Sequence, residues 1–227
     1  MRPAEQSDGR CIVPGMSDDD DVRQKETALA ELRQRLGDDH PDTLVAMLDL
    51  AEALWPRGLL TRARQLEEAV VAARRRTLGH DHPDTLKALG KLASTTGALG
   101  DPAQARVWQE EIVDGTRRAV GENHRDTLRA VNNLAGTIAA LGDLEGAREL
   151  LERTIAAMGQ ALGEDDPDTL TAVGNLAAVL WQMEEHDEAY WLQYHMAEAL
   201  RRIRGAADPG TRAALAILDT MQRDGRL

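Results

Sequence analysis

Apolar residues recur along this chain at spacings of three and four residues, and polar stretches containing glycine separate them. One set, which has the spacing of a single helical face, consists of Leu128, Val131, Leu134, Ala135 and Ile138. A second set with the same spacing consists of Ala147, Leu150, Leu151, Thr154 and Ile155. Gly142 and Asp143 lie between them and have the character of a helix stop and a helix cap. The pattern therefore predicts a hairpin of two amphipathic helices.

The same pattern returns at a fixed interval. The motif Leu-Gly-x-Asp-His-Pro-Asp-Thr-Leu occupies residues 36–44 and comes back at 78–86, 120–128, 162–170 and, degraded, at 204–212. Its glycines are 42 residues apart, at Gly37, Gly79, Gly121, Gly163 and Gly205. Helical hairpins repeated in this way stack on a continuous core, so we expect one elongated all-α superhelix, an α-solenoid.

The repeat also predicts how the chain is divided. We expect a disordered acidic tail over 1–21, a lone capping helix over 22–35, full repeats over 36–77, 78–119, 120–161 and 162–203, and a C-terminal capping helix over 204–227. The tail ends in four consecutive Asp residues and holds the single cysteine, Cys11, which we interpret as an incidental thiol. Met16 is a candidate natural start.

Helix starts are marked by a proline in three of the four repeats. Pro41, Pro83 and Pro167 suit the first helical position, whereas repeat three has Arg125 there. His40, His82 and His124 precede this position and are candidate metal ligands. Equivalent residues of neighbouring repeats are separated by whole helices at about 10 Å per packing step, too far for metal bonds near 2 Å. We therefore predict a helix-start role for the histidines, and no metal or cofactor.

Small residues at fixed positions carry a family resemblance. Leu-Ala pairs occur at 50–51, 92–93, 134–135 and 176–177, and the second helices share Ala63, Ala105, Ala147 and Ala189. With the turn glycines, these resemble tetratricopeptide repeats, and the 42-residue period with its His-Pro-Asp-Thr-Leu opening is similar to the kinesin light chain subfamily. The sequence contains no heptad segment like the one that joins kinesin light chains to their motor. A motor-adaptor role is therefore not implied.

The resemblance implies a peptide-binding groove on the inner face of the first helices. The positions that face such a groove carry Lys87, Lys91, Arg129, Asn133, Thr171 and Asn175, with Asn132 adjacent. Asn133 and Asn175 match the asparagine that clamps peptide backbone in the family. Three cations in a chain of net charge −12 predict an acidic or carboxylate-bearing partner, and the alternative is that they only solvate an exposed face.

Glycines and tryptophans lie at related positions of the repeat. Gly90, Gly97, Gly136 and Gly174 fall inside first helices, where their repeat offsets predict the groove side and an approach for another backbone. Trp55 and Trp181 occupy the same repeat position, and we expect them to flank the groove near its two ends. They can stack on a ligand or close the solenoid.

The second helix of repeat four departs from the others. When the repeats are aligned at their 42-residue period, equivalent positions form columns. In four of these columns, repeats one to three hold mostly Arg, Gln and Glu, whereas repeat four holds Tyr190, Trp191, Tyr194 and His195. Aromatic side chains exposed together indicate an interface, here a candidate homodimer contact or partner site. The alternative is that the final helix covers them.

Composition narrows the class of function. The acidic charge disfavours nucleic-acid and anionic-membrane binding, and no apolar run is long enough to span a bilayer, so we expect a cytoplasmic protein. No nucleophile, base and orienting group can be placed on one face, so we predict a non-catalytic adaptor or sensor that binds a protein or peptide. The alternatives are an enzyme or small-molecule-binding protein on a repeat scaffold, and a regulatory partner of a separately encoded ATPase or transcription factor.

Overall fold

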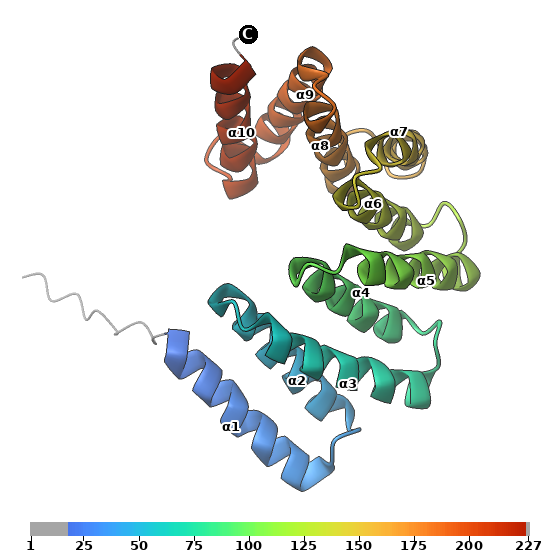
Figure 1. The fold of residues 1–227 in the computed structure, drawn as a ribbon, viewed down its shortest axis with the longest axis vertical. Helices are drawn as coiled ribbons and strands as arrows, with labels where there is room; N and C mark the ends of the chain where they lie inside the picture. Colours follow the sequence, from blue (N-terminus) through green and yellow to red (C-terminus); the bar gives the residue numbers. More distant parts are fainter. Residues whose placement is uncertain (1–17, 226–227) are drawn as a thin grey trace, which may run out of the picture.

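The computed structural model describes residues 18–225, and this part of the chain forms ten α-helices and one short 3₁₀ helix (Figure 1). They are α1 (Asp18–Leu36), α2 (Pro41–Leu54), η1 (Trp55–Arg57), α3 (Leu60–Leu78), α4 (Pro83–Ala98), α5 (Pro102–Val120), α6 (Arg125–Ala140), α7 (Leu144–Ala161), α8 (Pro167–Gln182), α9 (His186–Arg204) and α10 (Pro209–Gly225).

Each helix packs mainly against the helices before and after it in sequence, with a smaller contact between α6 and α8. Figure 1 shows the result as an arc of stacked helices from α1 to α10, whose open side faces left. The all-α solenoid of helical hairpins predicted from the repeat is confirmed. Within residues 18–225, no helix combines the length and the apolar character needed to cross a bilayer.

The N-terminal boundary differs from the prediction. Helix α1 begins at Asp18, so residues 18–21, which the sequence analysis assigned to the tail, are helical. The physical reason is that acidic side chains at a helix N-terminus interact favourably with the unpaired N–H groups and the macrodipole. Residues 1–17, including Cys11 and the candidate start Met16, lie outside the described part of the chain.

Small residues let the two helices of each hairpin approach. Ala63, Ala105, Ala147 and Ala189 are at most 2% exposed, and the alanines of the Leu-Ala pairs are at most 1% exposed. Because the distance between packed helices depends on the side chains at their contact, alanine at these positions allows a short separation. The columns that carry the family resemblance thus set the hairpin geometry.

Histidines cap the first helices as predicted. The Nδ1 atoms of His40, His82 and His124 accept hydrogen bonds from the backbone N–H two residues later, each at 3.2 Å. Asp166 takes this role in repeat four at 3.0 Å, and α6 begins at Arg125 without a proline. Among the described residues, no three His, Cys, Asp or Glu side chains lie close enough together to hold a metal ion.

A buried threonine ties each of three repeat junctions together. The hydroxyls of Thr85, Thr127 and Thr169 donate to the carbonyl oxygens of Gly79, Gly121 and Gly163, six residues earlier, at 2.8, 2.7 and 2.9 Å. These glycines have φ values of 94°, 95° and 103°, which L-residues rarely adopt. The threonine of the motif therefore anchors the loop that starts repeats two, three and four.

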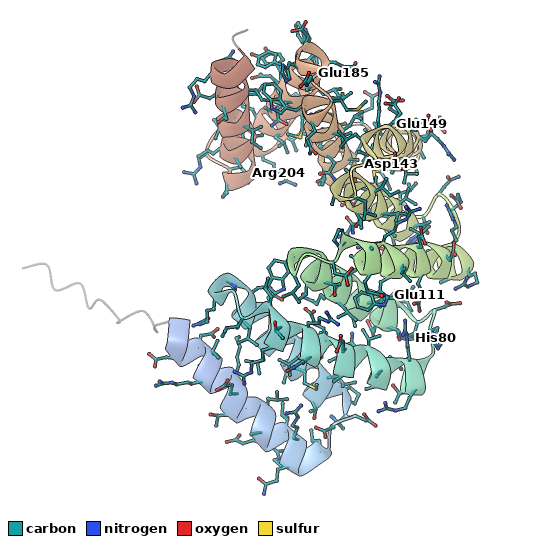
Figure 2. The ribbon with its side chains drawn as sticks, viewed as in Figure 1. His80, Glu111, Asp143, Glu149, Glu185 and Arg204 are labelled. Carbon is teal, nitrogen blue, oxygen red and sulfur yellow. The ribbon has the colours of Figure 1, made fainter. Side chains whose placement is uncertain are left out.

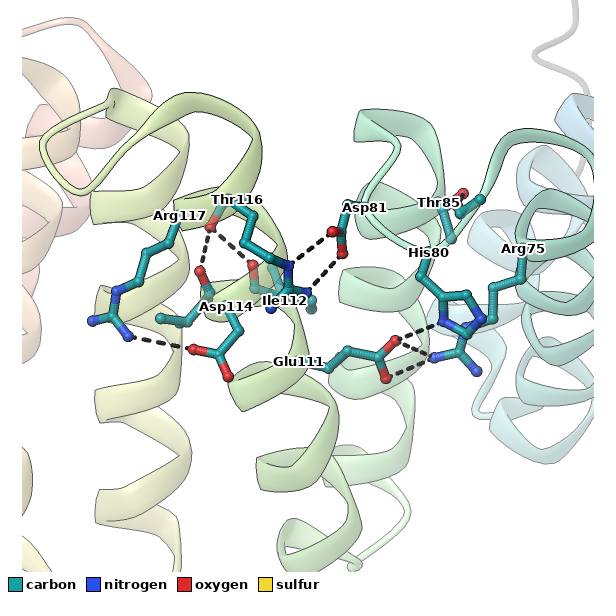
Figure 3. Close-up of polar contacts among 12 residues, drawn as sticks. Arg75, His80, Asp81, Thr85, Glu111, Ile112, Asp114, Thr116 and Arg117 are labelled. Carbon is teal, nitrogen blue, oxygen red and sulfur yellow. Dashed lines mark hydrogen bonds and ion pairs between the residues drawn. The ribbon is translucent and has the colours of Figure 1, made fainter.

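Charged side chains join neighbouring repeats on the outer side of the arc, where Figure 2 places His80 and Glu111. Glu111 of α5 accepts two hydrogen bonds from Arg75 of α3, at 2.6 and 2.7 Å, and lies 3.5 Å from His80 (Figure 3). His80 is 68% exposed, and the Arg75 and Glu111 side chains are 29% and 32% exposed, so solvent screens these contacts and each contributes only about 0–1 kcal/mol. The junctions, not the ion pairs, define the stack.

The junction threonines provide a matched pair for a stability test. Thr127→Val removes a buried hydrogen bond and should lower the free energy of unfolding by about 1 kcal/mol. Thr43 is equally buried, but its hydroxyl has no hydrogen-bond partner within the described residues. Thr43→Val should therefore leave stability unchanged or raise it. Urea unfolding followed by circular dichroism measures both, and equal losses would contradict the assigned role.

A second stability test concerns the turn inside the fourth hairpin. The turn position is Gly58, Gly100 and Gly142 in repeats one to three, all at positive φ, but Glu184 in repeat four, at φ 65°. Glu184→Gly should raise the free energy of unfolding by about 1 kcal/mol, because a left-handed conformation strains any side chain with a Cβ. Gly142→Ala is the opposite control and should lower it by a similar amount. Melting temperatures of the two variants that shift in the same direction would contradict backbone strain at Glu184.

Candidate functional site

A cavity of about 790 Å³ lies between the first helices of repeats two and three. Helices α4 and α6 form its sides, α5 lines its length, and residues of α2, η1 and α3 close one end. The predicted groove residues found in its lining are Trp55, Lys87, Lys91, Arg129 and Asn133. The structure therefore brings five residues, taken from the three elements η1, α4 and α6, to one site.

The remaining predicted residues are not brought to this cavity. Asn175 of α8 donates through Nδ2 to Oδ1 of Asn132 at 3.0 Å, and Asn132 is only 6% exposed. Thr171 donates to the carbonyl oxygen of Pro167, within its own helix. Asn132 and Asn175 thus link α6 to α8, and Asn175 does not line the cavity that Asn133 lines.

The two tryptophans contribute to different sites. Trp55 donates through Nε1 to the Thr95 hydroxyl at 2.9 Å and is 38% exposed at the edge of the cavity. Trp181 packs on the ring of His186, with centroids 4.3 Å apart, and lines a smaller pocket of about 460 Å³ between α8 and α10. Trp55 can meet a ligand in the large cavity, and Trp181 cannot reach it.

Each cation at the cavity is paired with a carboxylate. Lys91 lies 3.0 Å from Glu52, and the pairing lowers the pKa of Glu52 through a hydrogen bond and the lysine charge. Lys87 lies 3.7 Å from Asp84, and Arg129 lies 3.4 Å from Asp168. The positive field expected from the sequence is therefore offset, and the rim presents charges of both signs.

Two buried polar side chains, which the sequence analysis missed, also line the cavity. Glu67 of α3 is 2% exposed and Gln109 of α5 is 5% exposed. Burial raises the pKa of Glu67, while a hydrogen bond with Thr95 and the charge of Lys91 oppose the increase. Within the described residues, neither Glu67 Oε2 nor Gln109 Oε1 has a hydrogen-bond partner. The cavity therefore contains unused acceptors.

The four glycines of the first helices do not share one surface. An added Cβ at Gly97 would meet Ala105 at 3.8 Å, and at Gly174 it would meet Met196 at 2.9 Å. These two glycines face the following helix, which corrects the prediction that they border the groove. Gly90 lines the cavity, and a Cβ there would contact only Ile112, at 3.9 Å. Gly90 is thus the glycine that widens the site.

The aromatic group of repeat four is only partly covered. Tyr190 accepts a hydrogen bond from Gln222 of α10 at 2.7 Å, so the final helix covers this residue. Trp191 is 58% exposed and Tyr194 is 39% exposed. Trp191 stacks on His195 with ring centroids 5.6 Å apart. An exposed aromatic cluster therefore remains on the outer face of α9.

Comparisons with known proteins agree with this architecture. The profile of the tetratricopeptide repeat family matches residues 47–118 and 126–190, more than half of the chain. No curated protein sequence matches at a significant level. A Podosopora anserina protein, named as a kinesin light chain with nearly identical TPR-like repeats, has a crystal structure with a TM-score of 0.68 and 26% identity over 82% of this chain and 88% of that one.

Two further solved structures are similar in fold alone. BtubC (BKLC) from P. vanneervenii gives a TM-score of 0.72 at 17% identity, over 91% of this chain and 84% of that one. A Rap protein, solved in complex with competence and sporulation factor, gives 0.64 at 10% identity, over 88% and 58%. With the matched repeats and the kinesin light chain-like neighbour, these findings show that the chain belongs to the tetratricopeptide repeat family.

Proposed function

We propose that this protein is a non-catalytic interaction module inside the cell, an adaptor or regulatory sensor that takes an extended partner segment in the cavity between α4 and α6. The observation that carries the proposal is the convergence of Lys87, Lys91, Arg129 and Asn133 on one cavity. Tetratricopeptide repeats are typical protein-interaction modules, which favours a protein ligand over a substrate.

The chemistry of the cavity suits a polypeptide. Leu86, Ile112 and Val120 supply apolar wall, and Asn133 offers an exposed amide that can both donate to and accept from a backbone. Charged residues at the rim can fix the orientation of a segment without supplying most of its affinity. A carboxylate on the ligand would compete with Glu52 for Lys91, so an acidic partner is one version of the proposal.

A small molecule is the second candidate ligand. The volume of about 790 Å³ is within the range of small-molecule sites in proteins. A scaffold that senses a metabolite and regulates a separately encoded ATPase or transcription factor would use the same cavity. The experiment below separates these ligands, because a pull-down recovers a protein partner and not a metabolite.

The groove is tested by crosslinking in the native cell, followed by pull-down and mass spectrometry. Lys91→Glu with Arg129→Glu should lose the recovered partner, because each substitution breaks a rim ion pair, with Glu52 or Asp168, and leaves two like charges where the segment is oriented. Asn133→Ala should weaken binding about three- to tenfold at every salt concentration, since a lost hydrogen bond of roughly 0.5–1.5 kcal/mol is little screened. Purified proteins then give these affinities by titration.

The matched control is Arg106→Glu, which reverses an exposed arginine of α5 that pairs with Glu110 away from the cavity. It should retain the partner at wild-type affinity. All variants are compared by circular dichroism to confirm folding. If the groove variants and the control retain every partner equally, the cavity is not the protein-binding site.

We further propose that the exposed aromatic cluster of α9 is a contact between two copies of the chain. Three earlier repeats hold the ion pairs Arg64–Glu68, Arg106–Glu110 and Arg148–Glu152 where repeat four holds Tyr190 and Tyr194. Replacing charged pairs by aromatic residues at the same two columns removes the groups that keep an outer helix solvated. Large aromatic side chains are enriched in interfaces.

Sedimentation tests this second proposal. Trp191→Glu with Tyr194→Glu should shift the protein from dimer to monomer, because both side chains are exposed and their replacement leaves the core intact. Gln65→Glu with Ala69→Glu on α3, at exposed sites of repeat one, is the control and should leave the assembly unchanged. A wild type that sediments as a monomer at all concentrations would contradict the contact.

A further inference from the structure

The cavity is lined by two carboxyl groups, those of Glu67 and Asp126, that form no ion pair with a lysine or arginine of the described residues. Around its rim, Lys91 pairs with Glu52 and Lys87 with Asp84, while Arg129 shares Asp168 with Arg125. The three cations that line this site are therefore already paired, although the sequence suggested a groove with free positive charge.

The oxygens of Glu67 and Gln109 add a requirement for hydrogen-bond donors. Both side chains are more than nine-tenths buried, and Glu67 Oε2 and Gln109 Oε1 accept no hydrogen bond from the described residues. Leaving a buried acceptor unsatisfied is unfavourable, and native proteins contain few such groups. A ligand that brings N–H groups to these two oxygens would remove that penalty.

The repeat itself shows that the fold does not need these polar residues. Glu67 and Gln109 share one column of the repeat with Leu151 and Gln193. Leu151 is fully buried in repeat three, and Gln193 donates through Nε2 to the carbonyl oxygen of Ala214. Apolar and satisfied polar side chains thus fit the same column. The two members of this column that carry unsatisfied oxygens, Glu67 and Gln109, are the two that line the cavity.

We propose that the cavity binds an arginine side chain of the partner segment, with the guanidinium group at Glu67 and Gln109 and the aliphatic stem along Leu86 and Ile112. The inference rests on the proposed function and names the residue that the groove selects. A guanidinium group carries five N–H donors in a planar fork and a permanent positive charge, which matches acceptor oxygens on two helices, one of them in a carboxyl group that forms no ion pair with the described residues. Gly90 leaves the space beside Ile112 through which the stem passes.

The test uses n-propylguanidinium, an analogue of the arginine side chain, titrated into the full chain with NMR detection of the Gln109 side-chain amide. Saturable shifts are expected. Neutral n-propylurea and anionic butanoate, which keep the alkyl chain but change the charge, should bind at least about tenfold more weakly, because hydrogen bonds between charged groups are the stronger class. Equal binding of the urea, or tighter binding of butanoate, overturns the proposal.

The chain supplies its own matched variants. Glu67→Gln introduces the residue that repeat two has at this position, and Gln109→Leu introduces the residue that repeat three has there. Each should weaken the binding of n-propylguanidinium about three- to tenfold. Gly90→Leu copies Leu48 of repeat one and should block the site. Gly136→Leu, at an exposed glycine of α6 away from the cavity, should not.

This result is separable from that of the pull-down. In one outcome, the variants at Lys91 and Arg129 lose their partners but the wild type does not bind n-propylguanidinium. The groove is then a protein-binding site, and the proposal of an arginine subsite is overturned. Binding of n-propylguanidinium that is unaffected by Glu67→Gln, Gln109→Leu and Gly90→Leu also overturns it, because the cation then binds elsewhere. Thermal melts confirm that each variant is folded before it is titrated.

Discussion

The stack depends on the junction between one repeat and the next. At the well-formed junctions, a glycine at positive φ ends one helix, a histidine or aspartate caps the next helix, and a buried threonine hydroxyl holds the glycine carbonyl. These interactions span only a few residues, so the three junctions that contain all of them bend the chain in the same way. Because the motif recurs every 42 residues, identical bends accumulate into the arc of Figure 1. The function is then carried by positions outside the junction, which are free to change.

Comparing the same column in different repeats separates structural residues from functional candidates. Junction and hairpin columns keep their chemistry, for example the buried alanines from Ala63 to Ala189. The column of Glu67 and Gln109 changes from polar to apolar at Leu151, although every member is buried. The equivalent positions of a repeat protein thus serve as controls for one another. Where a buried column holds both polar and apolar residues, each polar member is explained by its own surroundings and not by the repeat fold.

The sequence predicts the fold well because its evidence is local and repeated. Helix starts at Pro41 and caps at His82 follow from residue type alone, and each is tested several times within one chain. The site is less predictable, because its properties depend on contacts between repeats. The pairing of Lys91 with Glu52, 39 residues apart, decides the charge of the groove, and helical periodicity carries no signal for it. The burial of Glu67 also depends on α4 and α5, but its column offered a clue.

The cavity contains features that oppose stability. Gly90 lies inside α4, where glycine costs about 1 kcal/mol relative to alanine, although the structure has room for a Cβ. Glu67 and Gln109 leave buried acceptors unsatisfied, whereas Leu151 shows that an apolar residue packs in the same column. Each feature alone can be an accident of packing. Their coincidence at one cavity, around a carboxyl group that forms no ion pair with the described residues, is more readily explained by a ligand that supplies both N–H donors and positive charge than by the requirements of the fold.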